Sequence, residues 1–282
     1  MDINPTPAGS APLDAGDARD VPAIPEGHPV GDARQAALLR GLRDLFAARS
    51  ADDLRAASLA LDACVAEHGG PASLPPNASA RHDPATGHAH PPGEDQWREA
   101  EYAFNRLFVG PMAVPAPPYA SAWLETEPRL MGESTMDVRA LYHALGYAVP
   151  GEGTTPDDHL SFELDAALAL LALRDADHPA AIVPSPAHPT PAEKGEEPGL
   201  AVEDAWRWLV AEHMGAWVPR FVQRALAEPG VPPAIARALA LLLCWQEDAA
   251  AACAHHAATK EITGASGVVQ ATDAPAPHSR RS

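Results

Sequence analysis

Apolar residues recur at helical spacing through the middle of the chain, and no segment shows a convincing strand-like alternation. Leu38, Leu42, Leu45 and Phe46 stand at i, i+4, i+7 and i+8, which places them on one face of a helix. Aromatic residues are only 5% of the sequence, and alanine and leucine dominate its apolar share. Both are strong helix formers, whereas strands favour β-branched and aromatic residues. We therefore predict an all-α fold, a single helical-bundle domain of about nine or ten helices with disordered termini.

The 31 prolines of the chain are concentrated between and beyond these helical patterns. Residues 1–32 and 260–282 lack the apolar side chains needed to offset chain entropy, so we expect two disordered tails. The interval 33–259 is expected to form one all-α domain, interrupted by proline-rich loops at 69–93 and 175–199. No internal repeat divides this interval.

Capping residues predict where several helices begin and end. Ser50 is expected to cap one helix, and Thr135 is expected to cap another that ends at Gly146. A helix that begins near Glu94 should stop at Gly110-Pro111, since both residues interrupt a helix. Further helices are expected over residues 121–130, 201–214, 217–227 and 232–257.

The most apolar helix is predicted to open at Thr155. Pro156 suits the first helical position, and Asp158 stands three residues after the cap, as in a capping box. The leucines that follow lie on more than one side of this helix. A helix that is apolar on several sides is expected at the centre of the bundle.

The net charge is -18, from 38 acidic against 20 basic residues. Such a surface repels nucleic acid and anionic lipid, and it attracts basic partners such as a peptide with arginines. We therefore expect no nucleic-acid partner. Simple solubility is the alternative reason for this charge.

Cysteine use and the N-terminus indicate the compartment. The three cysteines form no Cys-x-x-Cys pair, which favours a reducing environment. The N-terminal residues 1–29 are acidic and proline-rich and do not read as a secretory signal. The longest strongly apolar runs, 166–173 and 238–245, are too short to span a bilayer. We expect a cytoplasmic protein without stable membrane insertion.

A proline-rich stretch follows the Gly110-Pro111 stop and runs from Pro115 to Ser121. Because proline restricts the backbone, this stretch can hold Tyr119 and Trp123 beside a groove at little entropic cost. Aromatic side chains along a rigid groove suit an apolar peptide. The alternative is a tight connection between helices with its aromatic residues in the core.

Asp158 and His159 form the second candidate site. An exposed Asp158 could accept a charge-assisted hydrogen bond from an arginine, and His159 could add a hydrogen bond or respond to pH. The alternative is a helix cap beside a structural histidine. The pair could also serve acid–base catalysis in a small-molecule or nucleotide hydrolase, but no Gly-x-Ser-x-Gly elbow or phosphate-binding loop accompanies it.

Histidines in the first proline-rich loop are the third candidate. His82, His88 and His90 lie close together there, and His255-His256 lie near the end of the chain. A metal-binding protein that uses these histidines is a further alternative, although no cysteine partner accompanies them. We expect no cofactor, and an adventitious surface cluster is the simpler interpretation.

The order of several short motifs resembles the TorD/DmsD/NarJ family of redox-enzyme maturation chaperones. The resemblance covers roughly residues 35–257. Its motifs are Phe104 to Pro111, Pro117-Pro118-Tyr119-x-Ser121, Gly132-x-Ser134-Thr135, Pro156-x-Asp158-His159-Leu160-Ser161-x-Glu163-Leu164 and Glu212-His213-Met214-x-x-Trp217-Val218-Pro219. The long tail, the histidine loop and the insertion at 175–199 depart from the compact family pattern.

The resemblance implies a cytoplasmic all-α assembly chaperone and not an enzyme. Its partner would be an apo molybdopterin-dependent oxidoreductase subunit, or the twin-arginine signal peptide of that subunit, held until cofactor insertion is complete. The peptide-binding residues implied in this way, together with Trp123 from the loop argument, are Leu107, Phe108, Gly110, Pro118, Tyr119, Ser121, Trp123, Asp158 and His159. The identity and export of the client, and the oligomeric state, stay open.

Overall fold

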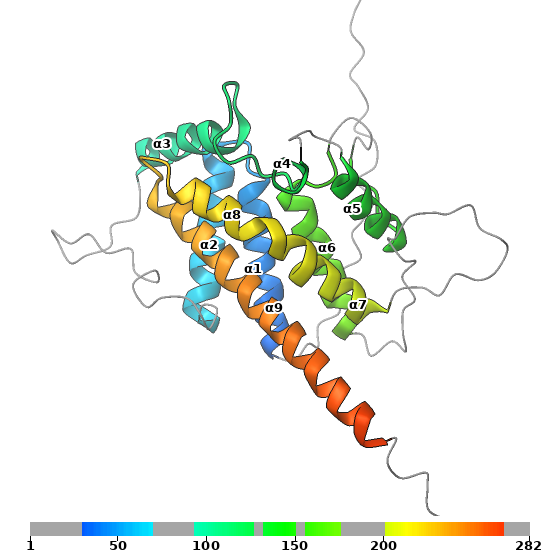
Figure 1. Cartoon of the computed structure of the whole chain (residues 1–282). Coiled ribbons are helices and arrows are strands. Elements are labelled where there is room, and N and C mark those ends of the chain that lie inside the picture. The colour runs from blue at the N-terminus through cyan, green and yellow to red at the C-terminus, as the bar shows by residue number, and fades with distance from the viewer. Residues whose placement is uncertain (1–29, 70–92, 127–131, 151–155, 176–200, 268–282) are drawn as a thin grey trace, which may run out of the picture.

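A computed structural model of the chain describes residues 30–69, 93–126, 132–150, 156–175 and 201–267. Within these residues the fold is all-α, as predicted, and the helices pack around one hydrophobic core (Figure 1). The α-helices are α1 (Val30–Phe46), α2 (Ala51–His68), α3 (Glu94–Phe104), α4 (Ser121–Leu124), α5 (Glu133–Ala144), α6 (Leu160–Asp175), α7 (Val202–Arg207), α8 (Met214–Leu226) and α9 (Pro233–Gly267). Two π-helical segments, η2 (Asn105–Val109) and η3 (Trp208–His213), continue α3 and α7.

Helix α1 packs between α2 and α6. Its apolar stripe is fully buried, and Leu39, Leu42 and Leu45 have no exposed surface. Ser50 caps α2 as predicted, because its side chain accepts a hydrogen bond of 3.2 Å from the backbone N–H of Asp53. The periodic leucines thus predict this part of the core directly.

Helix α3 begins at Glu94 and its π-helical continuation ends at Gly110, where the expected stop is confirmed. Gly110 adopts φ 102°, a left-handed conformation that favours glycine. The chain then passes through the proline-rich stretch to α4, which ends at Leu124. The predicted helix over 121–130 is therefore shorter than expected, and residues 127–131 lie outside the described part of the chain.

Helix α6 lies inside the bundle, where it packs against α1, α5, α7 and η3. Its predicted central position is confirmed, but its predicted start is wrong. The helix begins at Leu160, so Asp158 and His159 lie in the turn before it and not in its first turn. The reason is a long-range backbone pairing: the N–H of Leu160 donates to the carbonyl of Pro118.

The C-terminal helices differ from the expected pattern in two places. Residues 202–226 form one unbroken helical path through α7, η3 and α8, without the expected break near residue 215. Helix α9 continues to Gly267, beyond the expected boundary at 259, and its last part projects from the bundle in Figure 1. Its residues 254–259 are exposed accordingly.

Two further expectations concern caps and membranes. Thr135 lies inside α5, whose N-cap is Gly132, so the predicted cap at Thr135 is wrong, whereas Gly146 after the helix has the left-handed φ of 78° expected of a stop. No described helix combines the length and apolar character needed to cross a bilayer. The expected disordered tails and proline-rich loops fall largely outside the described residues.

Candidate functional site

The two candidate segments of the sequence meet in space. The backbone N–H of Ala120 donates to the carbonyl of Asp158 at 3.0 Å, and that of Leu160 donates to the carbonyl of Pro118 at 2.9 Å. These two bonds form an isolated antiparallel bridge between Tyr119 and His159. The bridge places the residues before α4 beside the residues before α6.

Asp158 lies at the centre of this junction and is fully buried. Its Oδ2 accepts a hydrogen bond of 2.6 Å from the backbone N–H of Ser121 at the start of α4. Its Oδ1 has no hydrogen-bond partner among the described residues. The expectation that Asp158 receives an arginine at the surface is therefore wrong for this structure, because the carboxylate holds two chain segments together.

His159 is partly buried and lies between two aromatic side chains. Its ring meets that of Tyr119 edge-on with the centroids 4.9 Å apart, and the ring centroid of Phe162 lies 5.9 Å away. The Nδ1 atom of His159 accepts a hydrogen bond of 3.2 Å from the backbone N–H of Ser161 and lies 2.8 Å from its Oγ. Burial lowers the pKa of His159 to about 4, although the nearby Asp158 raises it.

We expect His159 to make the folded protein less stable as the pH falls from about 6.5 to about 4. The unfolded chain takes up a proton on this residue near pH 6.5, whereas the folded chain does so only near pH 4, so acid favours unfolding. Between pH 7 and pH 4 this difference in proton uptake should lower the free energy of unfolding by about 3 kcal/mol. Urea unfolding between pH 7 and pH 4 should show a shallower loss for His159→Asn than for the wild type. If the unfolding free energies of the variant and the wild type fell equally with pH, His159 would not be held neutral in the folded protein.

Most of the other implied binding residues belong to the core. Phe108 packs in a cluster of six aromatic residues, which we call the aromatic cluster, and Leu107 and Ser121 are also buried. The members of the cluster are Phe46, Phe104, Phe108, Trp123, Trp217 and Phe221. Pro118 is buried, while Gly110, Tyr119 and Trp123 keep part of their surface exposed. The expectation that Leu107, Phe108 and Ser121 line a groove directly is therefore not met.

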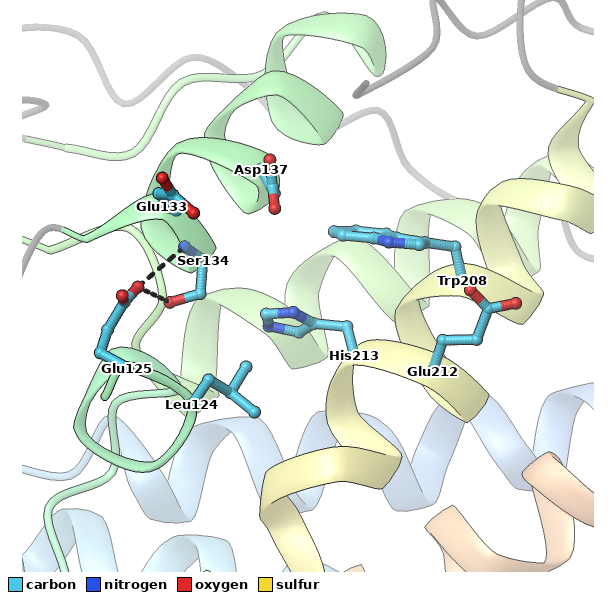
Figure 2. Close-up of a pocket in the computed structure, with 8 residues that line it drawn as sticks. All are labelled: Leu124, Glu125, Glu133, Ser134, Asp137, Trp208, Glu212 and His213. Atoms are coloured by element: carbon cyan, nitrogen blue, oxygen red, sulfur yellow. Dashed lines mark hydrogen bonds between the residues drawn. The ribbon is translucent and has the colours of Figure 1, made fainter. Parts of the chain in front are cut away.

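A pocket of about 320 Å³ opens beside this junction, between α4, α5 and η3 (Figure 2). It is lined by Leu124, Glu125, Glu133, Ser134, Asp137, Trp208, Glu212 and His213. Four of these residues carry carboxylates, and none of the eight is among the predicted binding residues. The wide turns of η3 bring Trp208, Glu212 and His213 to the same pocket wall, and π-helical segments are frequent at functional sites.

The wall formed by α5 depends on a close approach at Gly132. The Glu125 carboxylate accepts hydrogen bonds from the backbone N–H and the hydroxyl of Ser134, at 3.1 and 3.0 Å, and so caps the start of α5. A side chain at Gly132 would place its Cβ 2.2 Å from Oε1 of Glu125. Glycine at this position therefore leaves room for the cap.

Gly132→Ala should destabilise the protein by about 1 kcal/mol more than Gly93→Ala, because it displaces the Glu125 cap. Gly93 is a matched control, since it is the N-cap residue of α3 and a Cβ added there would meet no neighbouring side chain within 4 Å. Thermal or urea unfolding of both variants measures the difference. Equal losses would show that Glu125 contributes nothing to the start of α5.

A buried ionisable pair supports the pocket from behind. The Glu163 carboxylate, on α6, has no exposed surface and lies 2.8 Å from Nε2 of His213, and its other oxygen accepts from the indole N–H of Trp217 at 3.2 Å. Burial lowers the pKa of His213, but the Glu163 carboxylate, together with Asp158 and Asp137, raises it, and the net pKa is above its usual value. Burial raises the pKa of Glu163, against the effect of His213.

The geometry bears on the two alternative functions. The Asp158 carboxylate bonds the backbone of Ser121 and does not bond the ring of His159, so these two residues lack the base–carboxylate contact that hydrolases use. His82, His88 and His90 lie outside the described residues. Within the described part of the chain, no three potential metal ligands gather at one place.

Comparisons with known proteins place these features in a family. The chain matches the family described as nitrate reductase delta subunit over residues 72–223, more than half of its length. It is 31% identical over 130 residues to the Tat proofreading chaperone DmsD of Salmonella typhi, which covers 46% of this chain and 50% of that protein. The Salmonella typhimurium protein of the same name is 40% identical over 76 residues, 27% of this chain and 37% of the relative. The chain thus matches half or less of the length of these curated relatives.

Proposed function

This chain belongs to the nitrate reductase delta subunit family, and we propose that it is an assembly chaperone for a redox enzyme and not itself an enzyme. The observation that carries this proposal is the family match, because residues 72–223 contain both bridged segments and every residue that lines the pocket. The relatives named Tat proofreading chaperones support the same function.

We propose as the partner an apo molybdopterin-dependent oxidoreductase subunit, bound through its signal peptide or N-terminal segment in the cytoplasm. The chaperone would hold this subunit until cofactor insertion is complete. The net charge of -18 favours a partner segment that carries basic residues. Burying about 500 Å² of apolar peptide surface would supply on the order of 10 kcal/mol before ordering costs, which leaves a releasable affinity.

The predicted peptide-binding residues divide into two roles in this proposal. Tyr119, Trp123 and His159 keep exposed surface and would contact the peptide. The buried members, which include Phe108 and Asp158, would hold those contact residues in place through the aromatic cluster and the bridge. Leu107, Pro118 and Ser121 are also buried and belong to this second group, and Gly110 would support it by ending η2.

Co-purification from the organism that encodes the chain tests this function. The tagged protein should retain a molybdopterin-dependent oxidoreductase subunit in cells unable to make the cofactor, and much less of it in cells that make it. A client that lacks its N-terminal segment is the control and should not be retained. Absence of any such subunit in the cofactor-free cells would contradict the proposal.

A further inference from the structure

The helical path from α7 through η3 to α8 buries pairs of neighbouring residues at a spacing of four. The buried pairs are Ala205-Trp206, Leu209-Val210, His213-Met214, Trp217-Val218 and Phe221-Val222. In an α-helix, a spacing of four residues turns each pair by about 40° around the axis, so the last pair would point about 160° away from the first. Because all the pairs face the same core, this drift has to be taken up within the path.

The wide turn of η3 takes up the drift. The backbone N–H of Met214 donates to the carbonyl of Leu209, five residues back, whereas an α-helical bond reaches four residues back. The wider turn holds one more residue, which brings the pairs before and after it back to the same side of the helix. It also brings Trp208, Glu212 and His213 to the pocket, and we call these three residues the η3 wall (Figure 2).

A side chain from α9 supports this turn. In an α-helix the Val210 carbonyl would accept from the N–H of Met214, but that N–H donates to Leu209 instead. Nε2 of Gln246 donates to the Val210 carbonyl at 3.1 Å in its place. Only 3% of Gln246 is exposed, and this residue does not line the pocket. π-helical turns are rare, so a buried donor at the carbonyl that such a turn releases favours this register.

Two further features fix the junction between η3 and α8. Gly215 leaves room for Gln246, because a Cβ at this position would lie 3.1 Å from its Nε2. Glycine inside a helix is less favourable than alanine, so its presence here fits the need for a close approach of α9. On the side of α6, Glu163 contacts His213 and accepts from Trp217, one helical turn further along.

We infer that Gln246 is a positioning residue for the pocket: its bond to the Val210 carbonyl holds η3 in the π-helical register that presents the η3 wall. Without this donor the N–H of Met214 returns to Val210 and the turn tightens. Side chains on one side of the turn then rotate by about 100° relative to those on the other. The consequence for binding rests on the proposed function: a pocket without the η3 wall holds the client less tightly.

NMR spectroscopy of Gln246→Met tests the inference, because methionine keeps the length of the side chain and removes its donor. In the wild type the stacked indole of Trp208 shifts the imidazole protons of His213 by its ring current. The variant should lose most of this shift, and His213 should titrate at a lower pH, because its contact with Glu163 loosens. Gly215→Ala should cause the same two changes, since its Cβ displaces the amide of Gln246.

Two controls separate this effect from a loss of stability. Gln223→Met replaces an exposed glutamine on α8 and should leave both signals unchanged. Leu54→Ala opens a cavity beside α2 and should lower the stability without moving the His213 signals. In co-purification, Gln246→Met should retain about tenfold less apo subunit than the wild type, which is the effect of losing one hydrogen-bonded contact.

Wild-type His213 signals in folded Gln246→Met would overturn the inference, and circular dichroism confirms the folding. If that variant does not fold, the same comparison on Gly215→Ala decides. Full retention of the client by a variant whose η3 wall has moved would also overturn it, while the chaperone function would stand because the client is still held. If the wild type retains no client, the proposed function fails, and the NMR comparison decides the role of Gln246 by itself.

Discussion

Phe221→Ala should destabilise the protein by about 3–5 kcal/mol, the range for truncating a large aromatic side chain in a packed core. Phe221 has no exposed surface and lies at the centre of the aromatic cluster. Its ring centroid is 5.6–6.2 Å from those of Phe46, Phe108, Trp123 and Trp217. The substitution removes contacts to α1, η2, α4 and its own helix together, so neighbouring side chains can refill little of the cavity.

Leu226→Ala is the control on the same helix, because 44% of Leu226 is exposed. Its loss should be below about 1 kcal/mol. Urea unfolding followed by tryptophan fluorescence measures both variants, and Phe221→Ala should also change the native emission, since two cluster members are tryptophans. Similar small losses for both variants would show that the aromatic cluster does not hold these helices together.

Glu163→Ala should lower the free energy of unfolding by about 3–5 kcal/mol, because it breaks a buried charged pair by removing one partner. The substitution leaves Nε2 of His213 and the indole N–H of Trp217 without their acceptor inside the bundle. It should also lower the pKa of His213, because the Glu163 carboxylate contributes most among the groups that raise it. An NMR titration of the imidazole protons measures this second effect.

Asp165→Ala provides the comparison one half-turn along the same helix. Asp165 pairs with Arg43 at 2.9 Å, but its side chain is 51% exposed, and a surface pair of this kind contributes at most about 1 kcal/mol. The difference in unfolding free energy between the two variants thus compares the loss of a buried pair with the loss of an exposed one. If Glu163→Ala proved as mild as Asp165→Ala, or left the pKa of His213 unchanged, the pair would have no structural role.

Local sequence signals predict the helices well, and long-range pairing produces the main errors. The leucine stripe of α1, the Ser50 cap and the stop at Gly110 depend on residues within a few positions of one another. The start of α6, in contrast, depends on residues that are far apart in the sequence. Thr155 and Asp158 match a local capping pattern, but the backbone at 158–160 pairs with residues 118–120, which no local pattern records.

The candidate site is predictable only in part for a similar reason. Both bridged segments stand out in the sequence, yet the burial of Asp158 follows from its bond to Ser121, which lies far away along the chain. Glu133 and Glu212 are two of 38 acidic residues, and nothing local distinguishes them from a solvated surface. The Glu212-His213-x-x-x-Trp217 motif is the one available signal, since it contains both partners of Glu163.

The cofactor content of the client tests the chaperone function most directly. The gene for this chain would be deleted in the organism that encodes it, and its molybdopterin-dependent oxidoreductases would be purified and assayed for molybdenum and for activity. We predict that at least one of these enzymes accumulates without its cofactor, and that the wild-type chain restores it. Full cofactor content and activity of every such enzyme in the deletion strain would contradict the account.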